Sequence, residues 1–235
     1  MKKLLTSIFL LFISSQLAVA ELDKNYLVQI DKMVAENQYE KALDAFRYYF
    51  KESRKESSLG AVRLSFCLSA WVSLGKIYPP AMSELILMSN ERRNLLLAGK
   101  GNSETFQEYN AINRYIEKDN ETLATFIAIE KDFPQQAASY HFFAKDLIIN
   151  AKQYDLAKKY IDPIYEFENL RFLRESELSS SRKSKYAFAN SQSDVVFEKN
   201  VSELIELANK IGMKDAADDI KRRYANYISL SPLKK

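Results

Sequence analysis

The sequence predicts an all-α protein built from antiparallel helix hairpins. Only 5 glycines and 5 prolines occur in 235 residues, fewer turn-forming residues than a sheet of many short strands needs. Apolar side chains make up 47% of the chain and recur at spacings of three and four, the period of a helix that buries one face. We therefore expect about eleven helices with short connections.

The N-terminal residues have the pattern of a secretory signal peptide. Lys2 and Lys3 precede an apolar run over residues 4–13, and an Ala-Val-Ala ending places cleavage between Ala20 and Glu21. The run is shorter than the ~20 apolar residues of a permanent anchor, and we expect no later segment to span a membrane. The sequence thus predicts a periplasmic or secreted, soluble protein of bacterial type, with residues 21–235 as a single helical-repeat domain.

Charge and cysteine content narrow the classes of function. The 34 basic and 31 acidic residues nearly balance, which argues against nucleic acid as a partner. Cys67 is the only cysteine, so an internal disulfide is excluded and burial must hold the core together. Because Cys67 lies in an apolar stretch, we interpret it as an inert buried thiol.

The helices are predicted from apolar periodicity and from breakers. The expected ranges are 22–36, 39–53, 59–75, 80–97, 103–118, 120–133, 135–151, 154–167, 168–178, 194–211 and 213–229. The helix over 59–75 should pack through Val62, Phe66, Ser69, Ala70 and either Val72 or Ser73. Ser103 should cap the helix over 103–118. Residues 179–193, which are rich in Ser, Lys and Arg, should form an exposed loop.

The hairpin over residues 135–167 has the clearest pattern. Its first helix should bury a stripe comprising Ala137, Tyr140, His141, Ala144, Leu147, Ile148 and Ala151. After a turn at residues 152–154, the second helix should bury Tyr154, Ala157, Tyr160, Ile161 and Ile164. Pro163 should bend or end it, since proline removes a backbone donor.

Three stretches resemble the tetratricopeptide repeat. Residues 153–157 (QYDLA) and 37–42 (NQYEKA) are similar to the turn and second helix of that repeat, while Trp71, Leu74, Gly75 and Tyr78 match the W-x-x-L-G-x-x-Y signature of its first helix. Pro79 and Pro80 depart from the pattern. The resemblance implies a superhelix of stacked helix pairs with a concave binding surface lined by first helices.

The resemblance also implies candidate contacts and a function. Its register points to Ser139, Phe142, Asp146, Ile149 and Asn150 as the concave face of the central hairpin. An apolar anchor beside polar groups one helical turn away suits a peptide. We therefore expect a non-catalytic protein that binds a protein or peptide in the cell envelope. The alternative for Phe142 and Ile149 is packing against a neighbouring helix.

No catalytic, cofactor or metal signature is present. The neighbours of His141 at helical spacing are Ala138, Ala144 and Lys145, none of them a suitable metal ligand. Carboxylate pairs occur at Glu104 with Glu108, Glu203 with Glu206, and Asp215 with Asp218, and we interpret them as solvated helix faces. We expect no enzyme and no cofactor. Two alternatives stay open: an immunity or inhibitor protein against a periplasm-acting toxin or hydrolase, and a cell-wall-active enzyme with a carboxylate site.

Overall fold

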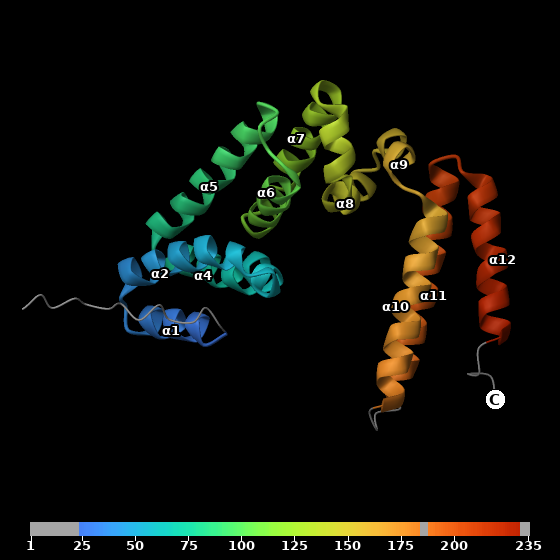
Figure 1. Ribbon diagram of the computed structural model, residues 1–235, viewed down its shortest axis with the longest axis horizontal. Helices are drawn as coiled ribbons and strands as arrows, with labels where there is room; N and C mark the ends of the chain where they lie inside the picture. Colours follow the sequence, from blue (N-terminus) through green and yellow to red (C-terminus); the bar gives the residue numbers. More distant parts are fainter. Residues whose placement is uncertain (1–23, 184–187, 231–235) are drawn as a thin grey trace, which may run out of the picture. The chain divides into compact units, whose positions relative to one another are not determined.

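The computed structural model describes residues 24–183 and 188–230, and throughout them the fold is all-α, without a strand (Figure 1). This confirms the predicted fold class. The expected signal peptide lies outside the described residues. The helices are α1 (Lys24–Ala35), α2 (Tyr39–Glu52), α3 (Gly60–Val62), α4 (Leu68–Ile77), α5 (Pro79–Leu97), α6 (Ser103–Tyr115), α7 (Asp119–Asp132), α8 (Pro134–Asn150), α9 (Tyr154–Tyr160), α10 (Pro163–Lys183), α11 (Phe188–Lys210) and α12 (Lys214–Leu230).

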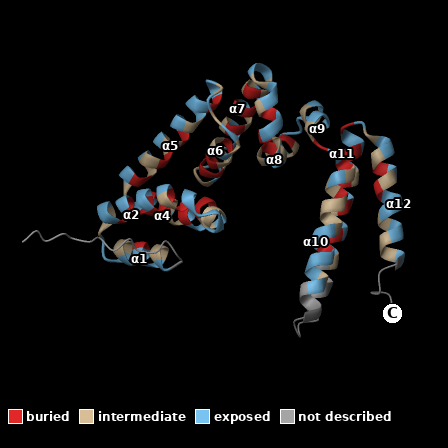
Figure 2. Ribbon diagram, in the orientation of Figure 1, coloured by how far each residue is buried: buried red, intermediate tan, exposed pale blue. Residues whose placement is uncertain are grey.

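The chain divides into two compact units, with the boundary inside α5 between Glu84 and Leu85. Each unit has its own buried side chains, and buried positions alternate with exposed ones along the helices (Figure 2). The organisation of residues 21–235 as one repeat domain, and the superhelical stacking of the hairpins, stay predictions.

Aromatic side chains form the core of the first unit. The indole of Trp71 is fully buried, stacks on Phe46 with ring centroids 5.5 Å apart and meets the edge of Phe50 at 6.2 Å. Its Nε1 donates a hydrogen bond of 3.0 Å to the carbonyl of Ala81, which joins α4 to the start of α5. A Cβ on Gly75 would lie 3.1 Å from Met82, so the glycine permits the close approach of these two helices.

The helix predicted over 59–75 packs through a different face from the expected one. Leu64, Cys67, Leu68, Trp71 and Leu74 are buried, whereas Phe66 is 72% exposed and Ser69 is exposed. Residues Arg63–Cys67 form a π-helical turn, which adds a residue to the turn and rotates the faces that follow. Apolar residues lie all round this segment, so periodicity alone does not choose between its faces.

The segment Ser57–Ile77 is also long and apolar enough to cross a membrane, by length and composition alone. The helix has 21 residues and contains an 18-residue window with a mean hydropathy of 1.3. The core helix of a soluble protein passes the same test, and Leu68 and Trp71 are fully buried inside the first unit. The absence of a membrane span stays a prediction.

The second unit contains two adjoining cores. The first core is formed by helices α5, α6, α7, α8 and α9 together with the C-terminal end of α11. Within it, Phe106 stacks on Tyr140 with ring centroids 5.2 Å apart. The second joins α10, α11 and α12 through Phe167, Phe197, Val201, Leu204 and Ile220. Ala157, on α9, is fully buried and Tyr154 packs against the first core, as the hairpin pattern predicted.

The exposed loop predicted over 179–193 is wrong for most of its length. Helix α10 continues to Lys183 and α11 begins at Phe188; residues 184–187 lie outside the described residues. The segment contains no glycine and no proline, and serine in a helix costs only about half a kcal/mol relative to alanine. Helices α10 and α11 therefore continue into this segment although its apolar residues show no helical periodicity.

One turn geometry recurs after several helices. Asn37, Glu117 and Lys152 have φ of 59°, 62° and 55°, and Gly99 and Gly212 adopt the same left-handed conformation. Gln38 and Gln153 then donate to the carbonyls five residues earlier, at 2.8 and 3.0 Å, as in a Schellman C-cap. Gly212 ends α11 in the same way, with Met213 donating to the carbonyl of Ala208 at 2.8 Å, and the turn reverses the chain from α8 into α9 and from α11 into α12.

Two helix starts clarify the boundaries. Asn102, and not Ser103, caps α6: its side chain accepts from the backbone N–H of Thr105 at 2.8 Å in a capping box. Pro163 ends the helix before it, as predicted, but is itself the first residue of α10. Asp162 caps α10 by accepting from the N–H groups of Ile164 and Tyr165 at 2.9 and 3.1 Å.

Glu108 does not belong to a solvated face. It is 1% exposed and accepts a hydrogen bond of 2.7 Å from Nε of Arg92 on α5, whose side chain is 11% exposed. Arg92 also donates to the carbonyl of Met88 at 2.9 Å. Glu104, one turn earlier on α6, is exposed as predicted. The ion pair fastens α5 to α6.

Removing one partner of this buried pair should destabilise the protein strongly. Glu108→Ala removes the counter-charge of the Arg92 guanidinium, which is largely buried and poorly hydrated. We therefore expect the free energy of unfolding, measured by urea denaturation, to fall by about 3–5 kcal/mol. Glu104→Ala, on the same helix, should cost about 0.5 kcal/mol or less. Equal losses for the two variants would contradict the assignment.

Candidate functional site

Helix α8 carries every residue predicted to bind, and its buried stripe fixes their directions. Ala137, Tyr140, Ala144 and Ile148 are buried as predicted. His141, predicted on the same stripe, is only half-buried and stacks on Tyr160 of α9 with ring centroids 5.5 Å apart. Its Nδ1 lies 2.7 Å from the carbonyl oxygen of Ala138, so the tautomer protonated at Nδ1 is the one that satisfies this contact. The arrangement is structural packing.

The structure separates the five predicted contacts into two groups. Asp146, Ile149 and Asn150 line a cleft, and Ser139 and Phe142 lie on α8 outside it. Phe142 is 67% exposed, so the alternative that it packs in the core does not apply to it, whereas Ile149 is half-buried and packs against the first core of the second unit. The Ser139 hydroxyl donates to the carbonyl of Gln136 at 2.7 Å.

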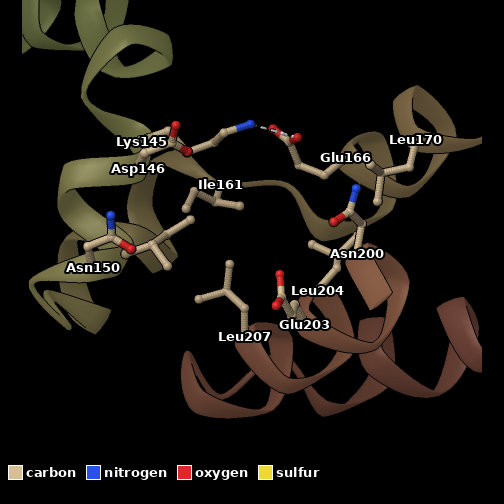
Figure 3. Close-up of a pocket in the computed structure, with 11 residues that line it drawn as sticks. Lys145, Asp146, Asn150, Ile161, Glu166, Leu170, Asn200, Glu203, Leu204 and Leu207 are labelled. Carbon is tan, nitrogen blue, oxygen red and sulfur yellow. Dashed lines mark hydrogen bonds and ion pairs between the residues drawn. The ribbon is translucent and has the colours of Figure 1, made fainter. Parts of the chain in front are cut away.

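The cleft has a volume of about 410 Å³ and lies among α8, the segment joining α9 to α10, and the helices α10 and α11 (Figure 3). One wall is the C-terminal half of α8, and the facing wall comes from α11. Figure 3 shows Asp146 and Asn150 on one side and Asn200 and Glu203 on the other. The lining residues are Lys145, Asp146, Ile149, Asn150, Ile161, Glu166, Leu170, Asn200, Glu203, Leu204 and Leu207.

Apolar side chains and polar groups have separate places in this cleft. The apolar surface comes from the isoleucines and leucines among those residues, of which Ile161, Leu204 and Leu207 are buried. Because Leu204 belongs to one core and Leu207 to the other, the cleft follows the seam between them. The polar groups are three carboxylates, two amides and one ammonium.

The charges are unevenly paired. Nζ of Lys145 lies 2.9 Å from a carboxylate oxygen of Glu166, and both side chains are about a quarter exposed at 24% and 23%. The same ammonium lies 5.7 Å from the ring centroid of Phe142, which connects that exposed ring to the edge of the cleft. Glu203 has only a solvated contact with Lys199 at 3.7 Å. Within the described part of the chain, the side chain of Asp146 has no hydrogen bond or ion pair.

Sequence reasoning missed the polar lining residues that lie outside α8. Glu166 comes from α10 and Asn200 and Glu203 come from α11, and only the packing of these helices brings them to the cleft. The first-helix register of the repeat resemblance points to α8 alone. No local pattern joins position 146 to position 203.

A second cleft, of about 500 Å³, lies in the first unit. It is lined by Leu27, Val28, Asp31, Val62, Phe66, Ser69 and Ala70. Its α4-side wall is the face that the sequence predicted to be packed, and Asp31 is its one charged lining residue in the described part of the chain. The cleft therefore offers apolar contact with little polar specificity.

The described residues contain no group of three or more His, Cys, Asp or Glu side chains that could hold a metal ion. Cys67 is fully buried, and this desolvation raises the pKa of its thiol to about 12, against a smaller opposing effect of Arg63. A thiol with this pKa is protonated at neutral pH and is a poor nucleophile.

No family model, curated protein or solved structure matches this chain. The function of the clefts must therefore be argued from their own geometry and chemistry. Of the two, the cleft beside α8 combines apolar surface with oriented polar groups, the combination that ligand sites in proteins require.

The buried thiol gives a test of the first unit. We expect Cys67 not to react with a thiol-specific disulfide reagent at about pH 8 in the native protein, because both burial and the raised pKa withhold the thiolate. In concentrated guanidinium chloride the same thiol should react at once. Rapid reaction of the native protein would contradict the packing of α4.

Proposed function

We propose that this protein is a non-catalytic binding protein and that the cleft beside α8 holds a peptide segment of a partner protein. The observation that carries the proposal is the cleft itself: Asp146, Ile149 and Asn150, expected on a binding face, line one wall of a cavity whose other wall is α11. An apolar floor with polar groups at its edge supports peptide recognition, because side chains fill the floor and the edge orients the backbone.

The spacing of the polar groups supports an extended ligand. Asp146 and Asn150 lie one helical turn apart on α8, about 6 Å along the axis, close to the rise of two residues in an extended chain. A carboxylate accepts from peptide N–H groups, and an amide both donates and accepts. Phe142, exposed one turn before Asp146, offers an apolar contact to the part of a ligand that leaves the cleft.

The architecture we propose around this site is a degenerate tetratricopeptide-like array. The recurring left-handed turn supports it: Glu117 and Lys152 occupy the same conformation at a separation of 35 positions, from 117 to 152, near the 34-residue period of that repeat. The contacts of α8 with α6, α7 and α9 are of the kind that stacked hairpins make.

The compartment we propose is the cell envelope, on the strength of the signal-like pattern over residues 1–20. A toxin or hydrolase neutralised there would be one such partner and would use the same recognition surface.

Filling the cleft should block binding. Peptides selected from a random phage-displayed library on the wild-type protein should lose at least about tenfold in affinity, equivalent to about 1.4 kcal/mol, when Asn150→Trp occupies the cavity. Gln135→Trp adds the same ring to an exposed position of α8 away from the cleft and should leave affinity unchanged. Affinities are measured by fluorescence anisotropy.

Both substituted residues are exposed, and circular dichroism should show wild-type helix content for each variant. A library that yields no binder, or binders that ignore Asn150→Trp, would falsify the proposed site.

A further inference from the structure

We infer that the segment held in the cleft beside α8 is cationic: a peptide in which arginine or lysine stands next to a large apolar residue. This inference rests on the proposed function and adds the chemistry of the ligand. It is carried by two features together, the imbalance of charge among the lining residues and the apolar floor beneath them.

The lining residues hold three carboxylates against one ammonium. Lys145 is engaged by Glu166 at 2.9 Å, so these two charges largely cancel one another where they stand. Asp146 and Glu203 are left on the two walls. Asp146 has no partner in the described part of the chain, and the Glu203 contact with Lys199 joins side chains that are 62% and 70% exposed, where water screens most of the attraction. The cleft therefore presents two negative charges that a ligand can neutralise.

The placement of these carboxylates suits a long basic side chain. Asp146 lies on α8 and Glu203 on α11, with the apolar side chains of Ile149, Leu204 and Leu207 lining the same cavity. The methylene stem of arginine or lysine can lie on the apolar floor while its charged end reaches a carboxylate. Arginine fits best, because its planar guanidinium can donate to a carboxylate and to an amide such as Asn150 or Asn200 at once.

The same arrangement disfavours an anionic ligand. A peptide carboxylate in the cleft would meet Asp146 and Glu203 while the ammonium of Lys145 stays occupied by Glu166. Like charges repel one another strongly in a partly desolvated cavity. The carboxylates therefore favour cationic peptides and disfavour anionic ones.

Three synthetic peptides of equal length test the inference: alternating Arg and Leu, alternating Glu and Leu, and alternating Arg and Ser. The Arg-Leu peptide should bind the wild-type protein, with affinity that falls as salt concentration rises. The Glu-Leu peptide should not bind, and the Arg-Ser peptide should bind more weakly because it leaves the floor uncovered. Asn150→Trp should block the binding of the Arg-Leu peptide.

Charge-neutral variants locate the recognition. Asp146→Asn and Glu203→Gln should each weaken the binding of the Arg-Leu peptide roughly threefold to fivefold, the scale of a partly exposed ion pair. Glu198→Gln is the matched control, since it removes the same charge from an exposed position of α11 outside the cleft and should change nothing.

The outcomes separate the inference from the function beneath it. If the Glu-Leu peptide binds as well as the Arg-Leu peptide and Asn150→Trp blocks both, the cationic ligand is refuted and the binding cleft stands. If Asp146→Asn, Glu203→Gln and Glu198→Gln all have equal effects, the attraction is that of the whole surface and the inference is again refuted. If no peptide binds, or if Asn150→Trp leaves binding intact, the proposed function fails with it.

Discussion

The packing of α8 between its neighbours is the constraint on which the second unit depends. Its stripe alternates small and large residues, so that Ala137 and Ala144 admit neighbouring helices closely while Tyr140 stacks on Phe106. Tyr140 also donates from its hydroxyl to the carbonyl of Gly101 at 2.8 Å, which ties α8 to the segment before α6. With one face committed in this way, the rotation of the helix is fixed.

That rotation decides what the rest of α8 can do. The positions opposite and beside the stripe face either solvent, as Phe142 does, or the cleft, as Asp146 and Asn150 do. The ion pair between Lys145 and Glu166 then connects α8 to α10 across the edge of the cleft. The position of the proposed binding surface thus follows from burial on the other side of the same helix.

The sequence predicted the helices better than it predicted their faces. Where an apolar stripe stands against polar positions, as at Ala137, Tyr140 and Ala144, periodicity alone identified the buried side. Over Ser57–Ile77 apolar residues surround the helix, and periodicity wrongly predicted that the side carrying Phe66 is buried. The π-helical turn that rotates the faces has no signature in the local sequence.

Polar residues show the same limit. Glu108 looked like one more solvated carboxylate, and only the arrival of Arg92 from α5 makes its burial tolerable. The wall opposite α8 was missed for the same reason, since only tertiary packing places Glu203 across the cleft from Asp146. The absence of glycine and proline between residues 179 and 193 was the available signal for continued helix, and it outweighs the polar composition of that stretch.

The position of the cleft along the seam between two cores has a consequence for mechanics. Leu207 packs with one core and Leu204 with the other, one turn apart on the same helix. A ligand that contacts both residues would link the two cores and couple the motions of α8 to those of α10, α11 and α12. Binding would then reduce the motion of the two cores relative to one another, also at positions far from the ligand. The two cores, which could otherwise unfold separately, would unfold in one cooperative transition.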